Sequence, residues 1–299
     1  MEKNISNPFL LQDQTVHPAQ IQLPEELRKK VVNLQCESME GICNVYLVGT
    51  CHISTQSCKD VEEIIGFLKP DVVFLELCER RAYCLNPRDP RVTRVPRFTD
   101  VMVALWMSNY SNAVSTLRCL VMRKRGEKLG VVPCSEFQSA YREAKKYCGK
   151  VVLGDRPAQI TWQRTWSKMS FWYKTKLFFT SLLQLATMSL VSVDVDANTA
   201  NYNQVLERKF PSMAETYIYE RDLYMASRLF EVAKECKSVV AVVGKGHVEG
   251  IEKNWKKPIA IESLMEVKAA TCSSDLKLWT ILAFAAVEIA IFSILWLKH

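Results

Sequence analysis

Residues 44–52, NVYLVGTCH, and residues 239–247, VVAVVGKGH, share one pattern. In each, β-branched and apolar residues lead into a glycine, and a histidine follows three residues later. The two pairs are Gly49 with His52 and Gly244 with His247. An apolar run of this length that ends at glycine is typical of a buried strand. The sequence therefore predicts two buried strands, each of which delivers a G-x-x-H motif at its carboxyl end.

The first of these strands opens a strand–helix–strand unit. A helical pattern runs through residues 58–69, and Pro70 ends it. Residues 72–77, VVFLEL, then predict a second strand with Glu76 near its end. Such units are parallel and right-handed. With a further strand over residues 150–153, the sequence predicts an α/β fold with a central, mainly parallel sheet, helices on both faces and chemistry at the carboxyl ends of the strands.

A long apolar run follows near the C-terminus. Residues 278–297 read LWTILAFAAVEIAIFSILWL, with one charged residue in twenty. Twenty residues match the ~30 Å hydrocarbon layer at about 1.5 Å per residue. Trp279 and Trp296 lie where interfacial aromatic residues belong. A buried core helix is the alternative, but we expect a single transmembrane helix, from Leu278 to Leu297, that anchors the chain by its tail.

Composition divides the chain into three parts. Residues 1–30 are polar and predict a flexible tail, residues 31–270 contain no linker and predict one domain, and residues 271–299 predict a linker and the anchor. Eleven scattered cysteines without a CxxC pair indicate reduced thiols in the cytosol. The short basic flanks of the anchor favour the mitochondrial outer membrane, facing the cytosol, over the endoplasmic reticulum. The net charge of +7 is spread along the chain, so we expect no nucleic-acid partner.

Two shorter uncharged runs cover residues 101–117 and 177–193. Seventeen residues are marginal for spanning a bilayer, and both runs contain several Ser, Thr, Asn or Gln residues. We expect helices that cover the sheet; a contact between copies in a homo-oligomer and a surface resting on lipid remain open.

Glu76 stands in an otherwise apolar strand. A buried carboxylate is costly unless it is bound to a metal, protonated or paired, and Arg81 is one candidate partner. His52 and His247 follow strands that should end at the same edge of the sheet. Two imidazoles and a carboxylate at one edge can bind a divalent metal ion, which would activate a water molecule. The alternative needs no metal, because one histidine could act as a general base assisted by Glu76.

These motifs together resemble the TraB-domain family, which is related to the pheromone-shutdown proteins of bacteria and to the Tiki metalloproteases. The stretches that carry the resemblance, in order over residues 43–260, are VYLVGTCHIS, KPDVVFLELCERR, VVLGDRPAQITWQRTW, YIYERDLYMA and VVAVVGKGHVEGI. The eukaryotic members, some with a C-terminal membrane segment, look closest. The resemblance implies that residues 31–270 form a TraB domain.

Further implications of the resemblance concern single residues. It implies a metal site of His52, Glu76 and His247 for Zn, Mn or Co, although Cys51, where the family often has Ala, leaves the metal identity open. Arg156 and Arg221 would bind a substrate carboxylate or stabilise an oxyanion. The remaining motif positions are Gly49, Arg81, Gly154, Asp155, Glu220, Asp222 and Gly244.

Two classes of function follow. The first is a membrane-anchored, metal-dependent hydrolase that resembles a peptidase, favoured by the intact histidines and glutamate. The second is a non-catalytic tether or adaptor at contacts between the mitochondrial outer membrane and the endoplasmic reticulum, with autophagy proteins as partners and a link to mitophagy. The expected anchor and the long apolar helices favour this alternative.

Overall fold

The computed structural model describes residues 23–51, 55–93, 97–107, 110–128, 130, 134–187 and 199–267. In chain order the elements are α1 (Glu25–Arg28), β1 (Val31–Ser38), β2 (Gly41–Thr50), α2 (Thr55–Leu68), β3 (Val72–Leu75), the 3-10 helix η1 (Glu79–Leu85), α3 (Pro90–Thr93), α4 (Phe98–Trp106), α5 (Tyr110–Lys128), α6 (Ser135–Lys146), β4 (Lys150–Leu153), α7 (Ala158–Lys168), α8 (Phe171–Thr187), α9 (Thr199–Lys209), α10 (Pro211–Ala214), the π-helix η2 (Glu215–Tyr219), α11 (Glu220–Ala233), β5 (Ser238–Gly244), α12 (Lys245–Asn254) and α13 (Ile261–Met265).

Five strands form one sheet in the order β1-β2-β5-β3-β4. The last four strands in that order are mutually parallel, whereas β1 runs antiparallel to β2 at one edge. The sequence analysis did not predict β1. Its alternate residues, among them Asn33 and Gln35, are polar, so it lacks the continuous apolar run of a strand buried on both faces.

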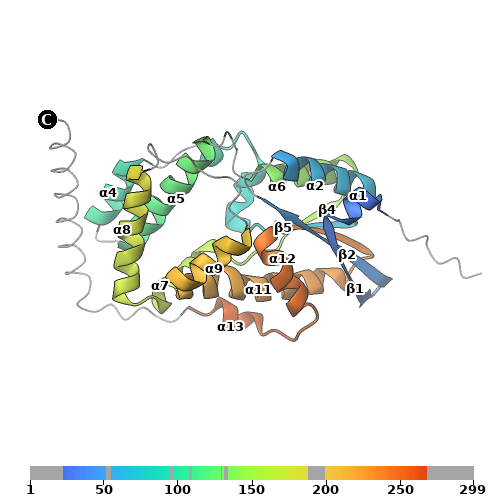
Figure 1. The fold of residues 1–299 in the computed structure, drawn as a ribbon. Coiled ribbons are helices and arrows are strands. Elements are labelled where there is room, and N and C mark those ends of the chain that lie inside the picture. The colour runs from blue at the N-terminus through green and yellow to red at the C-terminus, as the bar shows by residue number, and fades with distance from the viewer. Residues whose placement is uncertain are drawn as a thin grey trace, which may run out of the picture.

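Helices cover both faces of the sheet (Figure 1). On one face α2 and α6 pack through Ile64, Ile65 and Phe137 against strand residues such as Val240. On the other face α11 and α12 pack against the sheet, and Leu229 is completely buried there. The helix that follows β5 and the helices that follow its neighbours β2 and β3 thus lie on opposite faces. A crevice that opens where successive helices leave to opposite faces is the usual ligand site of such folds.

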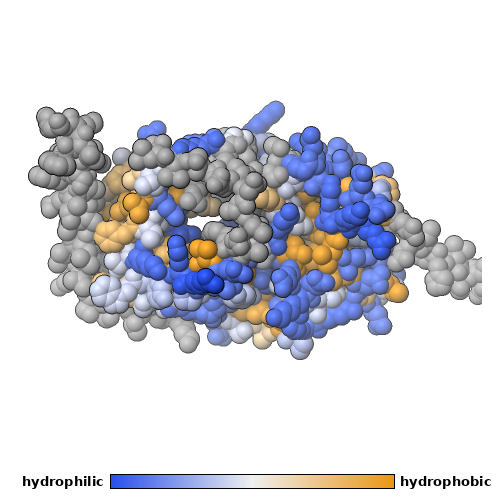
Figure 2. All heavy atoms as spheres, in the orientation of Figure 1, coloured by the Kyte–Doolittle hydropathy of each residue, from blue (hydrophilic) through white to orange (hydrophobic). Residues whose placement is uncertain are grey.

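A third apolar cluster lies beyond the sheet, where α4, α5 and α8 pack together (Figure 1). Val101, Leu117 and Leu177 are buried in it. Residues 101–117 are therefore divided between two helices. Apolar side chains also gather on the outside, over α4 and α8 (Figure 2), and Trp172 is 78% exposed.

The predicted fold class needs a correction. It included a single C-terminal transmembrane helix, yet no helix within the described ranges is long and apolar enough to cross a membrane. A span needs about 20 apolar residues, and α5, which is 19 residues long, carries Arg118 and Arg123. Residues 278–297, on which the prediction rested, lie outside the described residues. The described fold is a mixed α/β domain. The prediction that the fold includes a transmembrane helix was wrong for this described part of the chain.

Gly154→Ala should destabilise the fold. A Cβ atom at this position would lie 1.8 Å from Cζ of the buried Phe74 ring, so the ring or the strand must shift. Overpacking of this kind costs about 1–3 kcal/mol of the free energy of unfolding, which urea denaturation measures.

Gly66→Ala in α2 is the matched control. The nearest atom to its added Cβ would be 3.8 Å away, so the variant should be neutral or more stable by up to about 1 kcal/mol. A Gly154→Ala chain that unfolds at the wild-type urea concentration would contradict the packing described here.

Candidate functional site

The carboxyl ends of three parallel strands bring the predicted polar residues together. Glu76 directly follows β3, and its N–H extends the ladder by donating to the Val242 carbonyl at 3.1 Å. Asp155 lies two residues beyond β4. His247 lies in the first turn of α12, directly after β5. The structure therefore places Glu76, Asp155 and His247 at one edge of the sheet, in the crevice where the helices diverge.

Arg221, at the start of α11, lies at the centre of this group. Its Nε and Nη2 atoms donate to the two carboxylate oxygens of Asp155, both at 2.9 Å. Nη2 also donates to Glu76 Oε1, and Nη1 lies 3.1 Å from His247 Nε2. The Tyr217 carbonyl accepts from Nη1 at 3.2 Å. A forked guanidinium is suited to such multiple pairing, and the charges of Asp155 and Glu76 raise the pKa of Arg221 although its burial opposes this.

His247 is held between two carboxylates. Its Nδ1 atom lies 2.5 Å from Asp222 Oδ1, and its Nε2 atom lies 3.3 Å from Glu76 Oε1. Burial alone would lower the pKa of His247, but the charge of Glu76 and the hydrogen bonds to both carboxylates outweigh it and raise the pKa to about 9. The other oxygen of Glu76 accepts the Gly244 N–H at 2.6 Å. Both side chains are thus oriented by partners of their own.

Two glycines allow α12 to approach this site closely. A Cβ atom on Gly250 would lie 1.9 Å from Asp222 Oδ2, so only glycine lets Asp222 reach His247. A Cβ on Gly49 would lie 3.0 Å from the Val248 side chain. Gly250 is not among the residues predicted from the sequence, although a glycine within a helix, three residues after a motif histidine, was a signal of close packing.

A second charge network lies beside the first. Arg156 is completely buried, and it donates to Glu220 at 2.6 Å and to the Thr216 carbonyl at 2.8 Å. Arg164 and Lys168 also donate to Glu220. Burial would raise the pKa of Glu220, but the hydrogen bonds from its three cationic partners lower it to about 2. The burial of Arg156 favours a structural role, and its predicted contact with substrate stays a prediction.

Several residues of this second charge network come from one face of α7. Thr161, Arg164, Thr165 and Lys168 follow the i, i+3, i+4, i+7 spacing of a single helix face. A polar stripe of this kind normally faces solvent, so the sequence did not predict that it packs against η2 and the start of α11.

The other predicted positions have less direct placements. His52 lies outside the described residues, next to Cys51, whose N–H bonds to the Ser57 hydroxyl at 3.0 Å. Arg81 donates to Cys134 Sγ at 3.8 Å. Within the described ranges no group of three His, Cys, Asp or Glu residues could hold a metal ion. Glu76 and His247 alone supply two suitable atoms on one side of the site.

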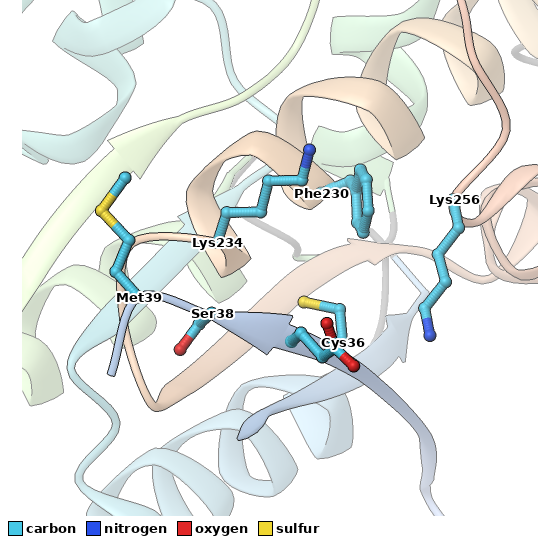
Figure 3. A pocket seen from close by; sticks show the side chains of 7 residues that line it. Cys36, Ser38, Met39, Phe230, Lys234 and Lys256 are labelled. Atoms are coloured by element: carbon cyan, nitrogen blue, oxygen red, sulfur yellow. The ribbon is translucent and has the colours of Figure 1, made fainter. Parts of the chain in front are cut away.

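A cavity of about 550 Å³ lies elsewhere, between β1 and α11 (Figure 3). Cys36, Phe230, Lys234 and Lys256 are among the side chains that line it. In the antiparallel register of β1 and β2, Cys36 lies opposite Cys43, which is near the amino end of β2. The cavity therefore lies at the opposite end of the strands from Glu76 and His247. It contains none of the residues predicted to be functional.

Comparisons with known proteins show which family the chain belongs to. The TraB/PrgY/gumN family model matches residues 38–259. An uncharacterized protein of Methanocaldococcus jannaschii is 35% identical over 222 residues, which are 72% of this chain and 54% of that protein. TraB domain-containing proteins of Mus musculus and Homo sapiens are 32% and 31% identical over 257 residues, which are 77% of this chain and 67% of each relative. The chain therefore belongs to the TraB/PrgY/gumN family, and it spans only about half the length of the archaeal relative.

Glu220→Gln should lower the free energy of unfolding at neutral pH by about 3–5 kcal/mol, because it leaves the buried Arg156 without its counter-ion. The pKa of Glu220 is lowered to about 2 in the folded chain, so its contribution is complete above the ordinary pKa near 4.5 and is lost as pH falls toward 2. Urea denaturation between pH 7 and pH 2 measures this.

The variant should also show a flatter loss of stability with acid than the wild type. Glu262→Gln in α13 is a carboxylate control outside this network and should follow the wild-type profile. Equal acid profiles for wild type and Glu220→Gln would show that Glu220 is not stabilised by its ion pairs.

Proposed function

We propose that this protein is a metal-dependent hydrolase that acts on peptide bonds, with Glu76, His247 and His52 as its metal ligands. The observation that carries the proposal is the 3.3 Å separation of Glu76 Oε1 and His247 Nε2. Two ligand atoms that lie about 2.0–2.1 Å from a tetrahedral ion are about 3.3–3.4 Å apart. The two side chains therefore fit two positions around one ion. His52 follows the neighbouring strand β2 and is the proposed third ligand.

The partners of His247 support the same assignment. Asp222 holds Nδ1, so Nε2 is the ring nitrogen that would bind an ion, in place of its present contact with Arg221 Nη1 at 3.1 Å. Metal-binding histidines commonly donate their other N–H to a carboxylate, which fixes the ring and makes it a better ligand. The Gly244 N–H orients Glu76 in a similar way. It donates to Oε2, so that Oε1 is directed toward His247. The chain thus orients both donors through residues that are not ligands themselves.

Arg221 has two tasks in this proposal. In the described structure its guanidinium bonds both Glu76 and Asp155, so it compensates two buried carboxylates. A divalent ion, when bound, would polarise the scissile carbonyl and activate a water molecule. Arg221 would keep its bidentate pair with Asp155, and when Glu76 Oε1 binds the ion, the second N–H of Nη2, which now donates to Oε1, would donate to the developing oxyanion. Its side chain is 12% exposed, whereas that of Arg156 is completely buried, so Arg221 is the arginine that substrate can reach.

One observation favours a second candidate, a non-catalytic adaptor. Met107, Trp172 and Leu183 on and beside α4 and α8 are each more than half exposed. Apolar side chains gathered on one face often mark a protein interaction surface (Figure 2). An adaptor would use this face and would need no chemistry at Glu76 and His247.

Metal binding and hydrolysis separate the two candidates. Calorimetric titration of the metal-free chain with zinc, manganese or cobalt chloride should give about one ion per chain. Glu76→Gln and His247→Ala each remove a ligand and should weaken binding by more than tenfold. Asp222→Asn removes only the orienting carboxylate and should weaken binding by about 10–100-fold. The loaded chain should cleave a peptide library, and the two ligand variants should not.

Glu62→Gln on α2 is the matched control, because this carboxylate bonds Ser139 and Arg142 on α6, on a face of the sheet away from the site. It should bind metal like the wild type. Circular dichroism checks that each variant is folded. If the folded wild type binds no ion at stoichiometric concentration and cleaves no peptide, the hydrolase should be abandoned for the adaptor.

A further inference from the structure

The outer edge of β1 is covered at two points and open between them. β1 is an edge strand, so in the described sheet its backbone groups that face away from β2 have no strand beside them. At one point the Gln35 carbonyl accepts from Nε1 of Trp255, directly after α12, at 3.3 Å. At the other, the Met39 N–H donates to the Lys234 carbonyl, directly after α11, at 2.9 Å. Glu37 lies between the two covered points.

The register of the hairpin shows which way the Glu37 backbone faces. Ser38 and Gly41 are opposite each other and flank a two-residue turn, so they form a hydrogen-bonded pair. Opposite residues in an antiparallel pair alternate between bonded and non-bonded pairs. The next pair, Glu37 with Ile42, is therefore non-bonded. The N–H and the carbonyl of Glu37 thus point away from β2, as one donor and one acceptor at the open part of the edge.

The cavity of about 550 Å³ lies at this open part, because Cys36, Glu37 and Ser38 all line it (Figure 3). Phe230 on α11 gives it an apolar wall and packs against the core cluster to which the buried Cys36 belongs. Sites for small molecules typically have volumes of about 300–1,000 Å³. The cavity therefore has the size of a ligand site and combines an apolar wall with a backbone donor and acceptor.

Two lysines border the cavity. Lys234 follows α11, and its ammonium lies 4.4 Å from the centre of the Phe230 ring. Lys256, two residues after α12, lies on the side of the cavity away from Met39 (Figure 3). Neither lysine forms an ion pair with another described residue. Lys256 also has a φ of 65°, a costly conformation of the kind that collects at ligand sites. With Glu37 included, the lining carries one net positive charge.

We propose that this cavity binds a ligand unit in which an amide N–H lies next to a free carboxylate, as in an N-acyl amino acid or at the C-terminus of a peptide. The amide N–H donates to the Glu37 carbonyl, and a carboxylate oxygen accepts the Glu37 N–H, as one residue of an added antiparallel strand does. Such a residue runs opposite to β1, so its carboxylate points toward the end of the cavity at Trp255 and Lys256. An apolar acyl group then lies toward Met39 and Phe230.

The covered points limit the length of chain that can pair with β1. A longer strand would need the Gln35 carbonyl and the Met39 N–H, which Trp255 and Lys234 already occupy. One residue can therefore pair at the open part, and any chain before it must leave the sheet. The proposal does not rest on the hydrolase, because the cavity lies at the opposite end of the strands from that site.

Calorimetric titration of the full chain with N-hexanoylglycine tests the proposal. This probe has the carboxylate, the amide N–H and an apolar chain, and one molecule per chain should bind with a Kd below about 1 mM. Its methyl ester lacks the charge and octanoate lacks the amide, so each should bind at least about tenfold more weakly. The peptide acetyl-Ala-Leu-Gly carries the same terminal unit. Tighter binding of the peptide than of hexanoylglycine identifies a peptide terminus as the source of the unit, and weaker binding identifies a free N-acyl amino acid.

Lys256→Gln should weaken the binding of hexanoylglycine by at least about tenfold, because it removes the charge next to the carboxylate. Lys253→Gln is the matched control, since it removes the same charge from α12 outside the cavity. This variant should bind like the wild type.

A second measurement needs no variant. Hexanoylglycine should slow the labelling of the buried Cys36 thiol by N-ethylmaleimide, and the exposed Cys148 should be labelled at an unchanged rate. The proposal is overturned if the wild type shows neither heat of binding nor protection of Cys36 at about 10 mM hexanoylglycine. Equal binding by Lys256→Gln and the wild type, or equal binding of the acid and its methyl ester, would overturn it as well.

Discussion

A single guanidinium joins the carboxyl ends of three strands. Arg221 pairs with Asp155 after β4, with Glu76 after β3 and with His247 after β5. Each carboxylate is almost completely buried, so each would carry a large desolvation cost without a cationic partner. The loops at this edge of the sheet can therefore close only around Arg221. The candidate site depends on that closure, since it brings the Glu76 carboxylate within 3.3 Å of the His247 ring.

The position of Arg221 depends in turn on the two residues beside it. Glu220, Arg221 and Asp222 are consecutive at the start of α11. Glu220 pairs with Arg156 after β4, Arg221 with Asp155 after β4 and with Glu76 after β3, and Asp222 with His247 on α12. A shift of α11 by one residue would separate all of these buried ion pairs at once. Because breaking one buried pair costs several kcal/mol, the triplet specifies the register of the helix strongly. The same three residues thus hold the buried ion pairs and the geometry of the candidate site together.

The chemistry available at this edge follows from how the charges are shared. Asp222 occupies one nitrogen of His247, and the Gly244 N–H occupies one oxygen of Glu76. His247 Nε2 and Glu76 Oε1 face each other at 3.3 Å, and Arg221 contacts both atoms. These two ligand atoms are held in position next to the Arg221 cation. They can bind an ion or a substrate oxygen without any rearrangement of the strands.

Local pattern was enough to place the parallel strands and the polar residues at their ends. A run such as residues 72–75 is apolar because both of its faces are covered, and the residue that follows it must leave the sheet at a defined edge. The same reasoning failed for β1, whose exposed side is polar. The C-terminal run at residues 278–297 lies outside the described residues, and within the described ranges no helix is long and apolar enough to cross a membrane.

The sequence by itself determined the family, the strand–helix order and the edge of the sheet at which Glu76 and His247 emerge. Only the tertiary structure decided that Glu76 pairs with Arg221, that Arg156 is buried, and that Asp222 orients His247 through the gap left by Gly250. The physical reason lies in the range of the interactions. Hydrophobic periodicity is a property of neighbouring residues, whereas an ion pair between residues 145 positions apart depends on how distant elements pack.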